Sequence, residues 1–113
     1  MGNLDKKYID LDSALARLGG NINLYHKLLE KFESSFDMLE FEHALQVKDY
    51  ESAGGIVHIA KGVAGNLSLD AFYKASQDLM DQLREGSAPN QEQVELFKQY
   101  FKETISAIQE YLA

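Results

Sequence analysis

Apolar residues along this chain recur every three or four positions rather than every second position. This spacing places them on one face of an α-helix, whereas alternation would indicate a strand. Pro89 is the only proline, so long stretches can be helical without interruption. The pattern predicts an all-α fold.

The first two helices are predicted from their end signals. A short helix begins after Asp10, whose side chain can cap it, and ends at Gly19, where glycine permits a left-handed stop. Asn21 can cap a longer helix that runs to about Val47, before Lys48 and Asp49 interrupt the pattern. Its apolar stripe includes Ile22, Leu24, Leu28, Leu29, Phe32 and Leu39.

Three more helices fill the rest of the chain. Asp49 can cap a third, which runs to about Leu67, and either Ser68 or Asp70 can cap a fourth, which ends before Gly86. A fifth follows the proline-containing loop. Because such short connections favour antiparallel neighbours, we expect an antiparallel four-helix up-and-down bundle with a short additional N-terminal helix.

Composition limits the classes of function. The chain has 113 residues, 45% of them hydrophobic, which suits a single domain over residues 1–113. Its net charge of −7 argues against nucleic-acid or membrane-surface partners, and no apolar run is long enough to span a bilayer. There is no cysteine, and the opening residues lack the order of a signal peptide. We therefore expect a cytoplasmic protein, monomeric because the bundle is complete within one chain.

The third predicted helix departs from what helix stability favours. On a helical wheel, one side of it gathers Gly54, Gly55, His58, Lys61, Gly62 and Gly65. Each glycine within a helix costs about 0.5–1 kcal/mol relative to alanine. Stability alone does not explain this face.

A glycine-lined histidine is open to another protein's backbone. A largely neutral imidazole at His58 can attack phosphorus without a separate base, and Lys61, three residues on, can place its ammonium near a phosphoryl group. The pattern therefore favours a carried phosphate. The alternative is that the glycines mark a tight helix crossing and His58 is an ordinary surface residue.

The segment His58-Ile59-Ala60-Lys61-Gly62-Val63-Ala64-Gly65-Asn66-Leu67 resembles the His-x-x-Lys-Gly-x-Ala-x-Asn-Leu signature of histidine-containing phosphotransfer (HPt) domains. The resemblance extends over most of the chain, including the segment from Leu18 to Leu29. It implies that His58 accepts a phosphoryl group, that Lys61 supplies a nearby cation, and that Gly62 and Gly65 let a partner dock closely.

The resemblance also implies the partners of a bacterial phosphorelay. They would be the receiver domains of a hybrid sensor histidine kinase and of a response regulator, and this chain could be the C-terminal module of such a kinase. Magnesium would come from the receiver. The sequence has no nucleotide-binding loop, so we expect a stoichiometric carrier without a cofactor of its own and not an enzyme.

The chain departs from the family pattern near the histidine. Met80 stands where many members have a polar residue on the adjacent helix that faces the phosphoacceptor. Gln77 and Gln82 are the nearby polar alternatives.

Two other functions compete. Glu40-x-x-His43 has the spacing of one half of a di-iron site, and His26 lies four residues before Glu30, but no later helix repeats the motif. We therefore expect His26 and His43 to be helix-surface residues. The second alternative is a non-catalytic adaptor bundle that docks a partner through the glycine-rich face.

Overall fold

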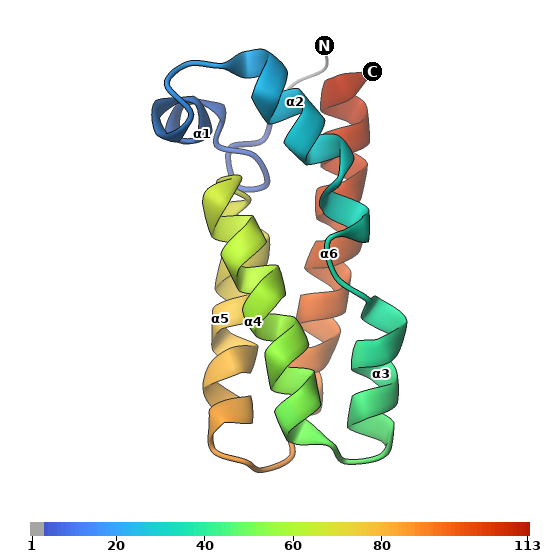
Figure 1. The fold of residues 1–113 in the computed structure, drawn as a ribbon. Helices are drawn as coiled ribbons and strands as arrows, with labels where there is room; N and C mark the ends of the chain where they lie inside the picture. The colour runs from blue at the N-terminus through green and yellow to red at the C-terminus, as the bar shows by residue number, and fades with distance from the viewer. Residues whose placement is uncertain (1–3) are drawn as a thin grey trace.

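The computed structural model describes residues 4–113, and residues 1–3 of the expected domain lie outside the described part. Within residues 4–113 the chain forms six α-helices and one 3-10 helix, with no strand (Figure 1). The prediction of an all-α fold is confirmed. The elements are α1 (Leu11–Arg17), α2 (Ile22–Glu30), η1 (Phe32–Ser34), α3 (Met38–Gln46), α4 (Tyr50–Asn66), α5 (Asp70–Arg84) and α6 (Gln91–Leu112).

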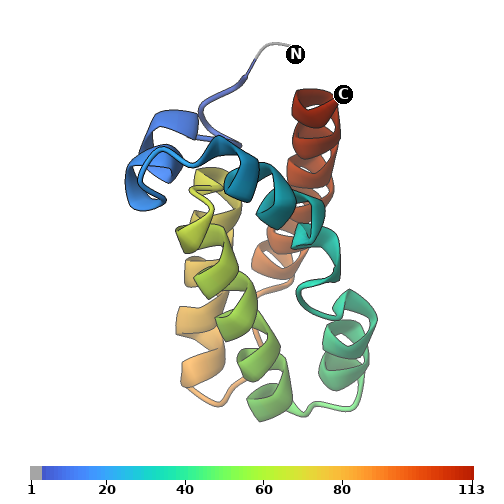
Figure 2. The same ribbon diagram turned by 45° about the horizontal axis from the view of Figure 1, so that its top comes forward.

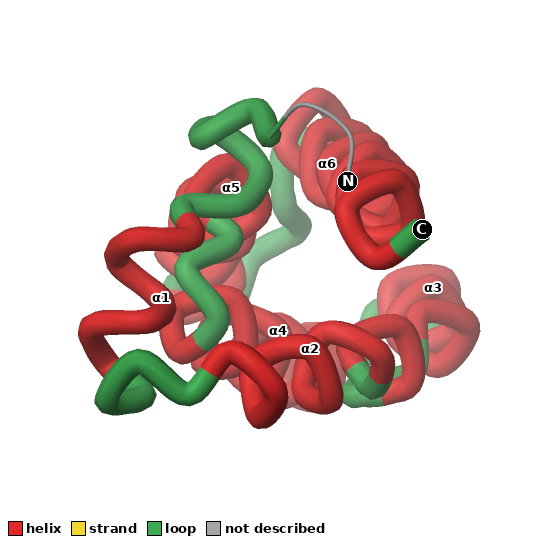
Figure 3. The backbone as a smooth tube through the Cα atoms, turned by 90° about the horizontal axis from the view of Figure 1, so that it is seen from above, coloured by secondary structure: helices red, strands yellow, loops and turns green. Residues whose placement is uncertain are grey.

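The longest helices build the body of the molecule. α4 and α5 form a helical hairpin, α6 packs against α5, and α3 packs against α4 (Figures 1 and 2). α1 and α2 lie across one end of this group, the end that faces the viewer in Figure 3 together with the C-terminus of α6. The molecule is elongated, with principal extents of 41 × 23 × 20 Å.

The prediction of one helix from Asn21 to Val47 is wrong. The chain leaves the α-helical path after Glu30, makes the short 3-10 helix η1, and resumes as α3 at Met38. The hydroxyls of Ser34 and Ser35 donate to main-chain carbonyls three residues back. Such local side-chain bonds offer the backbone an alternative to the helix, and they accompany the break here.

The broken segment is part of the core. Phe32 in η1 and Phe36 just after it both pack against aromatic rings of α5 and α6. The ring of Phe36 lies 4.9 Å from that of Phe101, and the ring of Phe32 lies 5.6 Å from that of Phe72. Asp37 then caps α3 by accepting from the backbone N–H of Glu40.

Most helix ends are where the sequence places them. Asp10, Asn21 and Asp49 each accept a hydrogen bond from a backbone N–H three residues on, which confirms the three predicted caps. The positive φ angles of Gly19 and Gly86 follow the ends of α1 and α5.

The start of α5 differs from the prediction, since neither Ser68 nor Asp70 caps it. Ser68 has a φ of 55° and belongs to the end of α4, where the N–H of Leu69 donates to the carbonyl of Ala64 at 2.9 Å. Asp70 is already the first helical residue. The N–H of Ala71 instead donates to the carbonyl of Lys7 at 2.8 Å, so the N-terminal segment satisfies the helix start.

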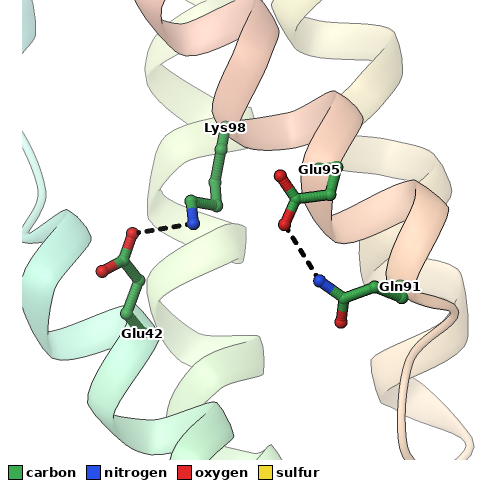
Figure 4. A network of polar contacts seen from close by, with 4 residues as sticks. All are labelled: Glu42, Gln91, Glu95 and Lys98. Atoms are coloured by element: carbon green, nitrogen blue, oxygen red, sulfur yellow. Dashed lines mark hydrogen bonds and ion pairs between the residues drawn. The ribbon is translucent and has the colours of Figure 1, made fainter.

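Two polar contacts involve surface residues of α6, and one of them joins α6 to α3. Lys98 Nζ lies 3.1 Å from a carboxylate oxygen of Glu42, and Gln91 donates to Glu95 one turn along α6 (Figure 4). Both contacts are partly or fully exposed, so each contributes at most about 1 kcal/mol. The buried Phe41 of α3, whose ring lies 5.1 Å from that of Phe97 in α6, holds α3 in place more than these contacts do.

Tyr25 fastens α2 to the end of α4. Its buried hydroxyl donates to the carbonyl of Leu67 at 2.6 Å, and burial raises the pKa of the Tyr25 phenol well above its ordinary value. We expect Tyr25→Phe to lower the free energy of unfolding by about 1–3 kcal/mol, because the Leu67 carbonyl loses its buried donor.

This contribution depends on pH. With the folded pKa raised, the stabilisation is full below the unfolded value near pH 10 and declines as the pH rises above it. Urea denaturation of both proteins at about pH 8 and about pH 11 should therefore show the stability gap between wild type and Tyr25→Phe narrowing. A gap of equal size at both pH values would contradict the assignment.

Candidate functional site

His58 lies in the middle of α4 with its side chain exposed. Within residues 4–113 its ring has no hydrogen-bond or ion-pair partner. It borders a concave surface that encloses about 480 Å³ and is formed by residues of α1, α4 and α5. The lining residues are Arg17, His58, Lys61, Gly62, Gly65, Asn66, Asp70 and Tyr73. The structure thus brings His58, Lys61, Gly62 and Gly65 to one site.

Gly55 and Gly62 form the open part of the helix beside His58. Both are exposed, and a methyl group added to either would meet nothing within 4 Å. The fold therefore does not need glycine at these two positions for close packing. The missing side chains instead leave room for another molecule to approach the imidazole.

Gly54 does not lie on this open face. It is buried, and a Cβ atom there would sit 3.8 Å from Cβ of Leu83 in α5. The expectation that Gly54 lies with the other glycines on an exposed side of the helix is wrong, because α5 packs over this part of α4. Gly54 belongs to the contact between the two helices.

Gly65 seats an aromatic ring. A Cβ atom there would lie 3.2 Å from the ring of Tyr73, closer than a side chain normally approaches. Gly65 is consequently only partly exposed. It forms part of the wall of the concave surface and does not leave open space as Gly55 and Gly62 do. Lys61 Nζ lies 5.9 Å from the centroid of the same ring, within the range of a cation–π contact.

Sequence reasoning did not find Arg17 or Tyr73. Arg17 comes from α1, and its guanidinium donates to the carbonyl of Gly65. The two residues lie 48 positions apart, so no spacing rule relates them. The only local signal was a basic residue in the last turn of a short helix, which is common in any protein.

The polar alternatives on α5 do not complete the site. Gln77 is exposed and does not line the concave surface, and the side-chain oxygen of Gln82 accepts from the N–H of Asn90 in the next loop. Met80 packs at the edge of the core. The α5 residues that do line the concave surface beside His58 are Asp70 and Tyr73.

The other two histidines have different surroundings. His43 is exposed on α3, as expected. His26 is half-buried, and its Nε2 lies 2.9 Å from the hydroxyl of Tyr111, so the expectation of a plain surface residue is wrong for it. Within residues 4–113 no three His, Asp or Glu side chains gather as metal ligands would. In the same residues, no helix combines the length and apolar character that a bilayer crossing needs.

Substitution of Gly62 tests how much stability the chain loses by having glycine on the exposed side of α4. We expect Gly62→Ala to raise the free energy of unfolding by about 0.5–1 kcal/mol, because alanine is the better helix former and its methyl group meets no neighbour. Urea denaturation measures the change.

Gly86→Ala is the matched control for this gain. Gly86 has a φ of 72°, so the same substitution should destabilise by about 1 kcal/mol. A loss of stability in Gly62→Ala would mean that the glycine is required by the fold itself.

Comparisons of the whole chain with protein-family models, with curated proteins and with solved structures found no match.

Proposed function

We propose that the protein is a phosphohistidine carrier, in which His58 accepts a phosphoryl group from a receiver-domain aspartate and passes it to the aspartate of a response regulator. The observation that carries this proposal is an exposed, unpartnered His58 on a concave surface that also holds the cations of Lys61 and Arg17. The resemblance of residues 58–67 to the HPt signature points to the same chemistry.

The fold is compatible with that role. If α2, η1 and α3 are taken together as one broken element, they stand with α4, α5 and α6 in the place of the four helices of an antiparallel bundle. α1 is then the additional N-terminal helix. In this arrangement the phosphoacceptor lies on the solvent side of α4, where a second protein can reach it.

The transfer needs a nucleophile and charge stabilisation. An unprotonated imidazole nitrogen of His58 attacks phosphorus, the new N–P bond forms, and the P–O bond to the receiver aspartate breaks. The aspartate leaves as a carboxylate with the bonding pair, and the imidazolium can release its proton to water. Lys61 lies one turn from His58 and offsets the negative charge of the transferred group.

The remaining chemistry belongs to the partner. A receiver domain would supply magnesium and the acidic residues that hold it, and would close over His58 to exclude water. Gly55 and Gly62 leave room for its backbone. Each molecule of the carrier accepts one phosphoryl group and is regenerated when it passes that group on. In this proposal the carrier is a cytoplasmic monomer, and it can be part of a hybrid sensor kinase.

The experiment is transfer of labelled phosphate from a panel of phosphorylated receiver domains to the purified protein. The expected product carries label that is lost in acid and retained in alkali, and peptide mapping places it in the segment that contains His58. Absence of transfer from every receiver to the folded protein would instead favour the adaptor bundle. That protein would use the glycine-rich face for docking alone.

A further inference from the structure

Helix α1 is fastened to the C-terminal end of α4 by contacts that converge on two residues. The N–H of Asp10 donates to the carbonyl of Ser68 at 3.0 Å, and the Ser68 hydroxyl donates to that of Ser13 at 3.1 Å. At the other end of α1, Arg17 donates to the carbonyl of Gly65. The guanidinium is therefore held at the site by the docking of a whole helix.

Neither cation of the site is neutralised by an acidic side chain. The ion pairs within residues 4–113 join Lys74 to Asp78 and Lys98 to Glu42. Asp70 lines the same concave surface but forms no ion pair with Arg17 or Lys61. A chain with a net charge of −7 thus keeps one concave surface with two cations against one carboxylate.

Both cations also keep hydrogen-bond donors for a ligand. A guanidinium has five N–H groups, and the Gly65 carbonyl accepts from one nitrogen of Arg17, so donors remain. Lys61 faces the Tyr73 ring, which attracts its charge without accepting a conventional hydrogen bond. Arginine and lysine donors on one concave surface fit an oxyanion with several equivalent oxygens.

We propose that Arg17 and Lys61 together bind the phosphoryl group carried on His58, so that α1 contributes a phosphoryl-binding residue to a site otherwise built on α4. Lys61 would hold the group from one turn along α4, and Arg17 from α1, which lines the same concave surface. Gly65 makes this possible by exposing its carbonyl to Arg17 and by seating Tyr73 beneath Lys61. This inference rests on the proposed phosphorylation of His58.

The test uses a small donor so that no partner protein is needed. Phosphoramidate transfers its phosphoryl group when its N–P bond breaks, ammonia leaves, and a new N–P bond to His58 forms. We expect Arg17→Gln to slow this reaction about tenfold or more, since one charged donor to the phosphoryl oxygens is lost. Arg17→Lys should recover part of the rate, and Arg84→Gln, on the exposed end of α5, should leave it unchanged.

A second measurement requires no substitution. The chain has two arginines, Arg17 and Arg84. In the wild-type protein, the NMR signal of the Arg17 side-chain Nε–H should shift when phosphoramidate phosphorylates His58, while that of Arg84 should stay in place. A purely structural role for Arg17 at Gly65 would leave its signal unmoved.

The outcomes separate this inference from the proposed function. An unmoved Arg17 signal, or an Arg17→Gln rate equal to that of wild type, would overturn the inference. Slower transfer from a phosphorylated receiver with an unchanged phosphoramidate rate would also overturn it, because Arg17 would then act on the partner. Phosphorylation of His58 by phosphoramidate that depends on Arg17, with no transfer from any receiver, would support the inference and contradict the carrier function.

Discussion

His58→Gln is expected to abolish phosphoryl transfer, with a rate at least about 1000-fold below that of wild type, because no nucleophilic nitrogen remains at this position. Glutamine keeps a polar side chain of similar size. The side chain of His58 is exposed and has no hydrogen-bond partner within residues 4–113, so the free energy of unfolding should change by no more than about 0.5 kcal/mol. The measurement is label transfer from a phosphorylated receiver domain, with urea denaturation of the same variant.

His43→Gln is the matched control. His43 is also exposed on a helix, but it lies on α3 and does not border the concave surface. Its replacement should leave transfer unchanged. Acid-labile label on the His58→Gln protein, or its loss from His43→Gln alone, would place the phosphoacceptor elsewhere and contradict the proposed carrier.

The fold could be predicted where local chemistry decides it. Side chains such as Asp10 and Asp49 cap helices because they accept from N–H groups three residues away, and this requires nothing from the rest of the chain. The break after Glu30 could not be found in the same way. The helical spacing of apolar residues continues through Phe32 and Phe36, so the pattern of apolar positions does not mark the break.

The candidate site likewise contains residues that local spacing predicts and residues that only tertiary contacts bring there. His58 and Lys61 lie on one helix, so their spacing alone places them together. Arg17 reaches the site through the docking of α1, a tertiary contact with no trace in local spacing. Gly54 shows the converse limit, since a helical wheel puts it near His58 but cannot tell that α5 covers it.

Phe72→Ala is expected to cost about 3–5 kcal/mol of the free energy of unfolding, the largest loss of stability that we predict. Phe72 is fully buried in α5, at the centre of the aromatic core. Its ring lies 5.1–6.0 Å from the rings of Phe32, Phe36, Phe97 and Phe101. Alanine would leave a cavity that these rings cannot close without moving the α2–α3 segment and α6 together.

Because a domain of this size has only about 5–15 kcal/mol of stability, the variant should unfold at a much lower urea concentration. Leu39→Ala is the control, since Leu39 is 78% exposed and its loss should change stability by no more than about 0.5 kcal/mol. A cost below about 1 kcal/mol for Phe72→Ala would mean that the rings do not share one core. Contacts other than those of Phe32 and Phe36 with Phe72 would then hold the segment between α2 and α3 in place.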